Sequence, residues 1–238
     1  ISAGNDIRYM PEKLDQASNF ANKLWNASKF ALGNIKEDID NSFMESENIP
    51  ENLAYEDKWI LSKLNNIIKE ITTNLDNYDM GVALQKIYDF VWNEFCDWYI
   101  EMVKPRLYDE NSINKDACLW TLNKVLINSL KLLHPIMPFI TEQIYMQLYN
   151  KDESIMISEY PVYNEKENFE QAEKNIERLK EIIVGIRNTR AELNVQNSKK
   201  ADLVFGDLGL VDKELKTNNP SFGDIMLLNK KIREYINT

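Results

Sequence analysis

The sequence contains few of the residues from which catalytic and metal sites are most often built. It has one histidine, His134, and two cysteines, Cys96 and Cys118, among 238 residues. None stands at metal-ligand spacing, and a lone histidine before a proline at a helix end more often packs or caps than acts as a base. No glycine-rich phosphate-binding loop is present either. The residues therefore predict no catalytic residue, no metal site and no cofactor bound by this chain.

Glycine and proline are scarce, and long apolar runs are absent. Seven residues of each type are few for an all-β fold, which needs many turns. No run approaches the roughly 20 apolar residues of a membrane-spanning helix. The first six residues lack the basic and apolar regions of a signal peptide. We therefore expect a mainly helical, soluble, cytoplasmic protein that does not act at a membrane.

The charge balance argues against a simple nucleic-acid binder. The chain has 38 acidic and 28 basic residues, a net charge of -10, whereas phosphate binding usually leaves a basic footprint. A local basic face remains compatible with an acidic total, because screening limits the field to about 10 Å at ordinary salt. An acidic helical scaffold that binds protein partners explains the charge more directly and stays open as an alternative.

Apolar residues recur at three- and four-residue steps over five segments, the spacing of amphipathic helices. These segments are 11–32, 56–75, 79–103, 115–133 and 138–149. The first is expected to bury a stripe that includes Leu14, Ala17 and Leu24, and the third to bury Val82. Pro105 is expected to end the third helix. Five amphipathic helices joined by short loops predict a helical bundle.

The chain after the bundle is less regular. Residues 154–160 alternate weakly and indicate an extended connector, and a long helix is expected over 167–194. Residues 201–205 fit one short strand. Beyond Gly206 the periodicity weakens, so the C-terminal element is predicted only as small and either α/β or helical.

Aromatic residues are concentrated on the third predicted helix, where we expect Trp92, Phe95, Trp98 and Tyr99 to form structural core. On the first predicted helix, Lys23, Lys29 and Phe30 lie off the aliphatic stripe. They form either a cationic and aromatic patch on which unpaired bases stack, or a solvated lysine face with one half-exposed phenylalanine. The pattern does not separate these two interpretations.

Several segments together resemble the region that follows the catalytic domain in valyl-tRNA synthetases. They are GNDIR at 4–8, NFANKLWNASKF at 19–30, WNEFCDWYIE at 92–101, LLHPIMPFITE at 132–142 and IRNTRAE at 186–192. The run FCDWY at 95–99 favours the valyl branch, whereas LLHPIMPFITE is shared more loosely with isoleucyl and leucyl relatives. The resemblance covers about residues 1–205.

This resemblance implies the anticodon-binding helical bundle of a class I aminoacyl-tRNA synthetase, a ligase of protein biosynthesis. The implied partner is valine tRNA, whose anticodon stem and loop the bundle would hold during ATP-dependent aminoacylation. The two ATP-binding signatures of that class are absent from this sequence. The fragment is therefore expected to lack catalytic residues, with ATP and magnesium used by a catalytic domain outside it. The parent enzyme is expected to be a monomer.

The resemblance also implies which residues contact tRNA. They are Lys13, Lys23, Asn26, Lys29, Phe30, Arg187 and Arg190. Phe30 and Lys23 occupy the positions at which the family stacks anticodon-loop bases on the first helix. Glu12 stands where relatives can place a basic residue, so Lys13 is the expected substitute. Arg187 and Arg190 either touch RNA or pair with neighbouring glutamates.

The resemblance further implies a division of the chain into four parts. They are a remnant of the connection from the catalytic domain at 1–9, the bundle at 10–153, the connector, long helix and strand at 154–206, and a remnant at 207–238 resembling the family's coiled-coil arm. The pieces of this arm stand closer together than in the family. The same module of isoleucyl-tRNA synthetase is the nearest alternative.

Overall fold

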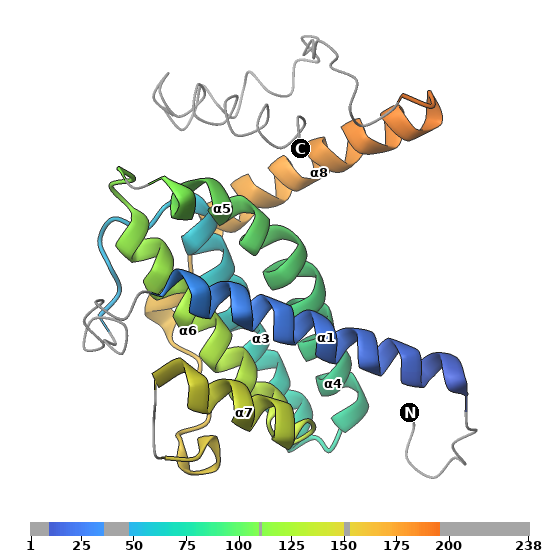
Figure 1. Ribbon diagram of the computed structural model, residues 1–238, viewed down its shortest axis with the longest axis vertical. Helices are drawn as coiled ribbons and strands as arrows, with labels where there is room; N and C mark the ends of the chain where they lie inside the picture. Colours follow the sequence, from blue (N-terminus) through green and yellow to red (C-terminus); the bar gives the residue numbers. More distant parts are fainter. Residues whose placement is uncertain (1–9, 36–47, 110, 150–152, 196–238) are drawn as a thin grey trace. The chain divides into compact units, whose positions relative to one another are not determined.

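The computed structural model describes residues 10–35, 48–109, 111–149 and 153–195 (Figure 1). The chain divides into two compact units, residues 1–176 and 177–238. The first unit contains the helical bundle. The second is described over 177–195, the greater part of the last helix. The predicted strand at 201–205 and the predicted remnants at 1–9 and 207–238 lie outside the described residues.

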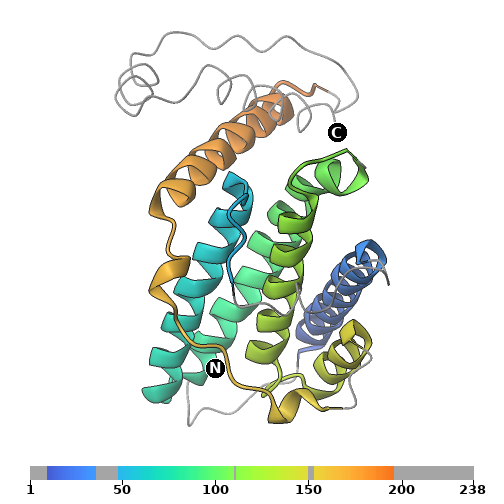
Figure 2. The ribbon, with the colours of Figure 1, turned by 90° about the vertical axis from the view of Figure 1, so that its left-hand side faces the viewer.

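The first unit is a bundle of helices, which confirms the predicted fold class. Its elements are α1 (Pro11–Asn34), α3 (Tyr55–Asp76), α4 (Met80–Asp89), the π-helix η1 (Phe90–Tyr99), α5 (Ile100–Tyr108), α6 (Lys115–Leu133) and α7 (Pro138–Tyr149). The helix α1 lies across one face of the bundle, against η1, α6 and α7 (Figures 1 and 2). The bounds of α6 and α7 match the predicted ranges.

The third predicted helix is longer than expected and contains a π-helical segment. Helix α4, η1 and α5 follow one another without a break from Met80 to Tyr108. Phe90, Phe95 and Ile100 are all buried at five-residue steps. In a π-helix each hydrogen bond spans five residues, so this spacing keeps all three side chains on the buried side.

Pro105 does not end this helix, as predicted, but lies inside α5. Proline removes one helical hydrogen bond and normally breaks a helix. Here the turn that contains it is held from both sides. Val103 and Leu107 are buried, and Arg106 is bonded to α3. These tertiary contacts keep the last turn helical.

The first half of α1 is solvent-exposed, contrary to the predicted apolar stripe. Leu14 is 55% exposed, and the first buried residue of the helix is Phe20. Ala17 is exposed as well, as is Val82 on α4. Periodicity identifies the apolar side of a helix but does not show how far along the helix the neighbouring helices reach.

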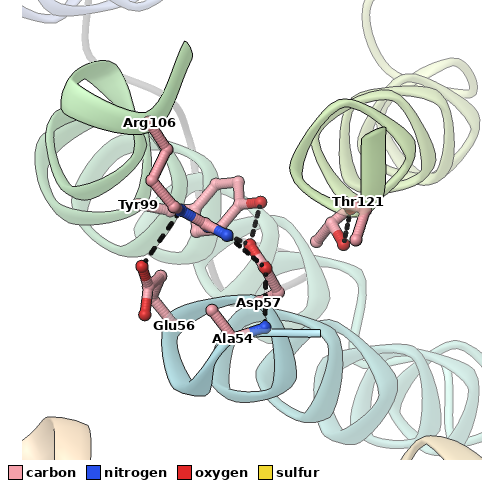
Figure 3. Close-up of polar contacts among 7 residues, drawn as sticks. Ala54, Glu56, Asp57, Tyr99, Arg106 and Thr121 are labelled. Atoms are coloured by element: carbon pink, nitrogen blue, oxygen red, sulfur yellow. Dashed lines mark hydrogen bonds and ion pairs between the residues drawn. The ribbon is translucent and has the colours of Figure 1, made fainter. Parts of the chain in front are cut away.

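A cluster of charged side chains is buried where the first turn of α3 meets the last turn of α5 (Figure 3). Asp57, at the start of α3, accepts two hydrogen bonds from the Arg106 guanidinium at 2.6 and 2.8 Å. It also accepts one from the Tyr99 hydroxyl at 2.9 Å and one from the backbone N–H of Ala54 at 3.0 Å. Glu56 lies 3.2 Å from Arg106 Nε. Asp57 and Tyr99 are fully buried.

The pKa values of the buried groups follow from this cluster. Burial lowers the pKa of Arg106, but hydrogen bonds and charge from Asp57 and charge from Glu56 outweigh that effect and raise it overall. Burial and the charge of Asp57 raise the pKa of Tyr99, so it stays a neutral hydrogen-bond donor. Burial raises the pKa of Cys118 to about 12, despite the opposing charge of Arg106.

The segment between α7 and α8 is fixed by side chains of the bundle. It contains two short 3-10 helices, η2 (Ile155–Ile157) and η3 (Glu165–Glu167), where an extended connector was predicted over 154–160. The side-chain amide of Asn65 exchanges two hydrogen bonds of 2.8 Å with the backbone of Asn164. Lys124 forms an ion pair of 2.6 Å with Glu167. These contacts determine where α8 (Glu170–Glu192) begins.

No helix within the described part of the chain is both long and apolar enough to cross a membrane.

We expect Arg106→Met to lower the free energy of unfolding by about 3–5 kcal/mol, because it leaves Asp57 and Glu56 buried without their cation. Denaturant titration measures this loss. Lys86→Met removes an exposed ion pair with Glu70 and should cost less than about 1 kcal/mol. Equal losses in the two variants would show that the buried cluster does not hold the bundle together.

We also expect both cysteines to react slowly with a thiol reagent at pH 8 in the folded chain. The pKa of Cys96 and that of Cys118 are each raised by burial from 9.0 to about 12. Only roughly one thiol in ten thousand is then ionised at pH 8, and the thiolate is the reactive form. Because both shifts are upward, their contribution to stability persists below pH 9 and is lost as the pH rises from 9 toward 12. Modification at the rate of the denatured chain would contradict this assignment.

Candidate nucleic-acid interface

The second half of α1 presents a polar face to solvent beside one aromatic ring. Asn22, Asn26 and Lys29 are exposed, and their spacing of four and three residues places them on one side of the helix. Phe30 is half-buried next to them. This helix therefore brings together three of the predicted contact residues, Asn26, Lys29 and Phe30.

A lysine from a different helix joins this surface. The ammonium of Lys104, on α5, lies 5.9 Å from the centre of the Phe30 ring, within the range of a weak cation–π contact. The Lys104 side chain is 35% exposed and forms an ion pair with Glu101. The sequence pattern did not single out Lys104, because nothing in the sequence shows that α5 ends beside the second half of α1.

We use the term Phe30 surface for Asn26, Lys29, Phe30 and Lys104. It offers an aromatic ring for stacking, two ammonium groups for phosphate and an amide for hydrogen bonding to a base edge. Single-stranded nucleic acids are recognised by this combination of groups. The ammonium of Lys29 also lies 5.7 Å from the centre of the Trp25 ring on the same helix.

The ammonium of Lys23, by contrast, is bound by other side chains of the protein. Its ammonium lies 2.5 Å from the Asp97 carboxylate and 3.8 Å from the centre of the Trp92 ring. The Trp92 ring in turn stacks on Tyr88 and Phe20. These contacts attach α1 to η1 and orient the helix that carries Phe30.

Lys13 does not join the Phe30 surface. It lies on the exposed first turns of α1, seventeen residues before Phe30. At the helical rise of 1.5 Å per residue the two positions are about 25 Å apart. Any RNA contact of Lys13 would therefore involve a different part of the ligand.

Arg187 and Arg190 lie on the last turns of α8, in the second unit. Arg187 is exposed and Arg190 is half-buried. Both have partners within the protein.

The four aromatic residues predicted as structural core differ in their burial. Phe95 and Tyr99 are fully buried, and their rings stack with centres 6.3 Å apart. Trp92 and Trp98 are half-buried. These two tryptophans are therefore less buried than predicted.

Acidic residues border the Phe30 surface. Asp97 is 50% exposed and bonds Lys23, and Glu101 is 48% exposed and bonds Lys104. A phosphate that approaches Lys104 therefore competes with a carboxylate. The neighbouring carboxylates therefore weaken any general attraction between this surface and a polyanion.

His134 has a structural contact. Its Nδ1 lies 2.8 Å from the hydroxyl of Thr141, and that hydroxyl donates to the backbone carbonyl of Met137 at 2.9 Å. The same hydroxyl also lies 3.2 Å from the backbone carbonyl of Pro138. The pair of His134 and Thr141 connects the end of α6 to the first turn of α7. No group of three or more metal-ligating side chains gathers anywhere among the described residues.

Comparison with known proteins assigns this bundle to a family. A family model described as the anticodon-binding domain of tRNA ligase matches residues 57–205. The chain is 48% identical over 201 residues to the valine–tRNA ligase of Clostridium perfringens, an alignment that covers 84% of the chain and 22% of the relative. It is 47% identical over 202 residues to that of Clostridium acetobutylicum, covering 85% and 22%, and 40% identical over 223 residues to that of Enterococcus faecalis, covering 92% and 24%.

The chain thus spans about a fifth to a quarter of the length of these curated relatives. The family model matches well over half of the chain, and the matched residues include nearly all of α3 and the whole of α4, η1, α5, α6 and α7. The chain belongs to the family of anticodon-binding domains of tRNA ligases.

Proposed function

We propose that this chain is the tRNA-binding module of a valine–tRNA ligase and holds the anticodon stem and loop of valine tRNA. The observation that carries the proposal is the Phe30 surface, where the half-buried ring of Phe30 on α1 lies 5.9 Å from the ammonium of Lys104. Lys104 is among residues 57–205, which the family model matches, and α1 precedes them. The named relatives are valine–tRNA ligases, which favours the valyl over the isoleucyl branch.

The residues of the Phe30 surface have distinct roles in this proposal. An unpaired anticodon-loop base stacks on the ring of Phe30, Lys29 contacts the adjoining phosphate, and Asn26 donates or accepts at a base edge. Lys23 fixes α1 against η1 through Asp97 and Trp92. Lys23 therefore acts as a positioning residue for Phe30. The family resemblance had implied that Lys23 contacts tRNA directly.

Contacts at the anticodon supply binding energy far from the reacting groups. In the proposed parent enzyme this energy orients the acceptor end of the tRNA at a separate catalytic domain, which uses ATP and magnesium. Lys13, Arg187 and Arg190 remain proposed phosphate contacts for parts of the tRNA beyond the Phe30 surface.

The acidic total charge is compatible with this function. Binding to one loop needs only a few cations near the ligand, since charges beyond about 10 Å are screened at ordinary salt. We therefore expect an affinity that falls with salt, but with a shallow slope that reflects few phosphate contacts.

The substitution Phe30→Ala should weaken binding of valine tRNA by about 1–3 kcal/mol, the contribution of one base stack. Filter binding or fluorescence titration of the 238-residue chain measures the change. Phe139→Ala is the matched control, because Phe139 is an aromatic residue on α7 that is 90% exposed. An affinity unchanged by Phe30→Ala, with the fold intact by circular dichroism, would remove Phe30 from the interface.

The two α1 lysines should differ in their effect on salt dependence. Lys29→Gln removes a phosphate contact and is expected to reduce the slope of log affinity against log salt by about 1. Lys23→Gln should leave that slope unchanged, since its ammonium bonds Asp97, and should lower the thermal midpoint of unfolding instead. A reduced slope in Lys23→Gln would show that Lys23 contacts phosphate directly.

A further inference from the structure

Lys104 stands out because it brings a second helix to the aromatic ring of the Phe30 surface. Its ammonium lies 5.9 Å from the centre of the Phe30 ring. The partner that holds it is Glu101, one turn earlier on α5. The weak contact with the ring and the strong contact with the carboxylate make the ammonium a group that can change partners.

The backbone that carries Lys104 is fixed on both sides. Val103 is fully buried before it, and Arg106 is bonded to Asp57 two residues after it. The Cα atom of Lys104 is therefore held in place, while its side chain reaches to the surface. Because the Cα atom of Lys104 is fixed and its ammonium can move, the side chain suits a ligand whose negative charge lies at a constant distance from the Phe30 ring.

A nucleotide stacked on Phe30 has such a charge. Its base covers the ring, and its sugar and phosphate lie at the margin of the stack. Lys29 is the residue before Phe30 on α1 and is exposed, and Lys104 approaches the ring from α5. Two ammonium groups from two helices fix the position of a phosphate better than two from one helix, because they approach it from different directions.

We propose that Lys104 leaves Glu101 on tRNA binding and contacts the phosphate of the nucleotide stacked on Phe30. This inference rests on the proposed function and adds a residue that the sequence did not indicate. In the free chain Glu101 neutralises Lys104, so the Phe30 surface attracts polyanions weakly. Only a ligand that also stacks on Phe30 offers enough contacts to displace the carboxylate, and Glu101 therefore favours a stacked loop over other RNA.

The test is a double-mutant cycle on the 238-residue chain with valine tRNA. Lys104→Gln should weaken binding about three- to tenfold at low salt, the scale of one partly screened charged hydrogen bond. It should also reduce the salt slope by about 1. Glu101→Gln should tighten binding about two- to fivefold, since it removes the competing carboxylate. In the double variant that gain should disappear.

A second ion pair in the bundle provides a close control. Lys86 and Glu70 form an ion pair between α4 and α3, with side chains 36% and 48% exposed, against 35% and 48% for Lys104 and Glu101. Neither residue belongs to the Phe30 surface. Lys86→Gln and Glu70→Gln should therefore change affinity by less than the corresponding variants at Lys104 and Glu101.

The outcomes separate this inference from the proposed function. If Phe30→Ala weakens binding but Lys104→Gln matches Lys86→Gln in affinity and salt slope, Lys104 is not a phosphate contact and the inference is wrong. If Glu101→Gln still tightens binding when Lys104 is glutamine, Glu101 acts by general repulsion, and the partner exchange is wrong. If neither Phe30→Ala nor Lys104→Gln changes the affinity, the Phe30 surface is not the binding site and both assignments are wrong; if the unaltered chain does not bind valine tRNA at all, the proposed function fails.

Discussion

The buried pair of Arg106 and Asp57 is the interaction on which the placement of the functional surface depends. It joins the first turn of α3 to the last turn of α5, and Tyr99 and Glu56 complete it. A buried charge without a partner is costly, so the arrangement of the two helix ends that pairs Arg106 with Asp57 and Glu56 is strongly favoured. Arg106 also keeps the turn containing Pro105 helical. The same turn carries Lys104, so the buried contact between Arg106 and Asp57 also fixes the position of Lys104 beside Phe30.

The packing of α1 on the π-helical segment is the second requirement. Phe20 of α1, Tyr88 of α4 and Trp92 of η1 stack on one another, and Lys23 of α1 contacts Trp92 and Asp97 beside them. The buried side chains of η1 recur at steps of four and five residues, and Phe95 and Tyr99 are among them. Trp92 is half-buried, and the ammonium of Lys23 lies over its ring. The aromatic residues thus serve the interface indirectly, by holding the helix that carries Phe30.

Much of this fold could be predicted from the sequence, and the exceptions have physical reasons. Three- and four-residue periodicity predicted the bounds of α6 and α7, because each helix buries an apolar side that extends toward both of its ends. It failed for Leu14, since periodicity does not show where the packing partners of α1 end. Pro105 was expected to end a helix by local preference, and the tertiary bonds of Arg106 override that preference. The spacing of Phe90, Phe95 and Ile100 was visible in the sequence and indicates a π-helix in retrospect.

The functional surface was harder to predict than the fold. Lys29 and Phe30 follow from helical spacing on α1, and Asn26 was added by the resemblance to the synthetase family; the structure brings the three together. Lys23 shares that pattern, yet its charge is bonded within the protein, and a sequence does not reveal which lysines have internal partners. Lys104 could not be found, because its proximity to Phe30 depends on the contact between helices seventy residues apart in the chain. Lys13 has the right chemistry on a part of α1 too distant for the same surface.

The most direct test of the account is binding of the 238-residue chain to an RNA hairpin that contains only the anticodon stem and loop of valine tRNA. The same hairpin with a changed anticodon serves as the comparison, and both are titrated at low and moderate salt. The account predicts tighter binding to the valine anticodon and a loss of affinity as salt rises. Equal affinity for the two hairpins would contradict it, because recognition would then lie outside the anticodon loop and outside the Phe30 surface.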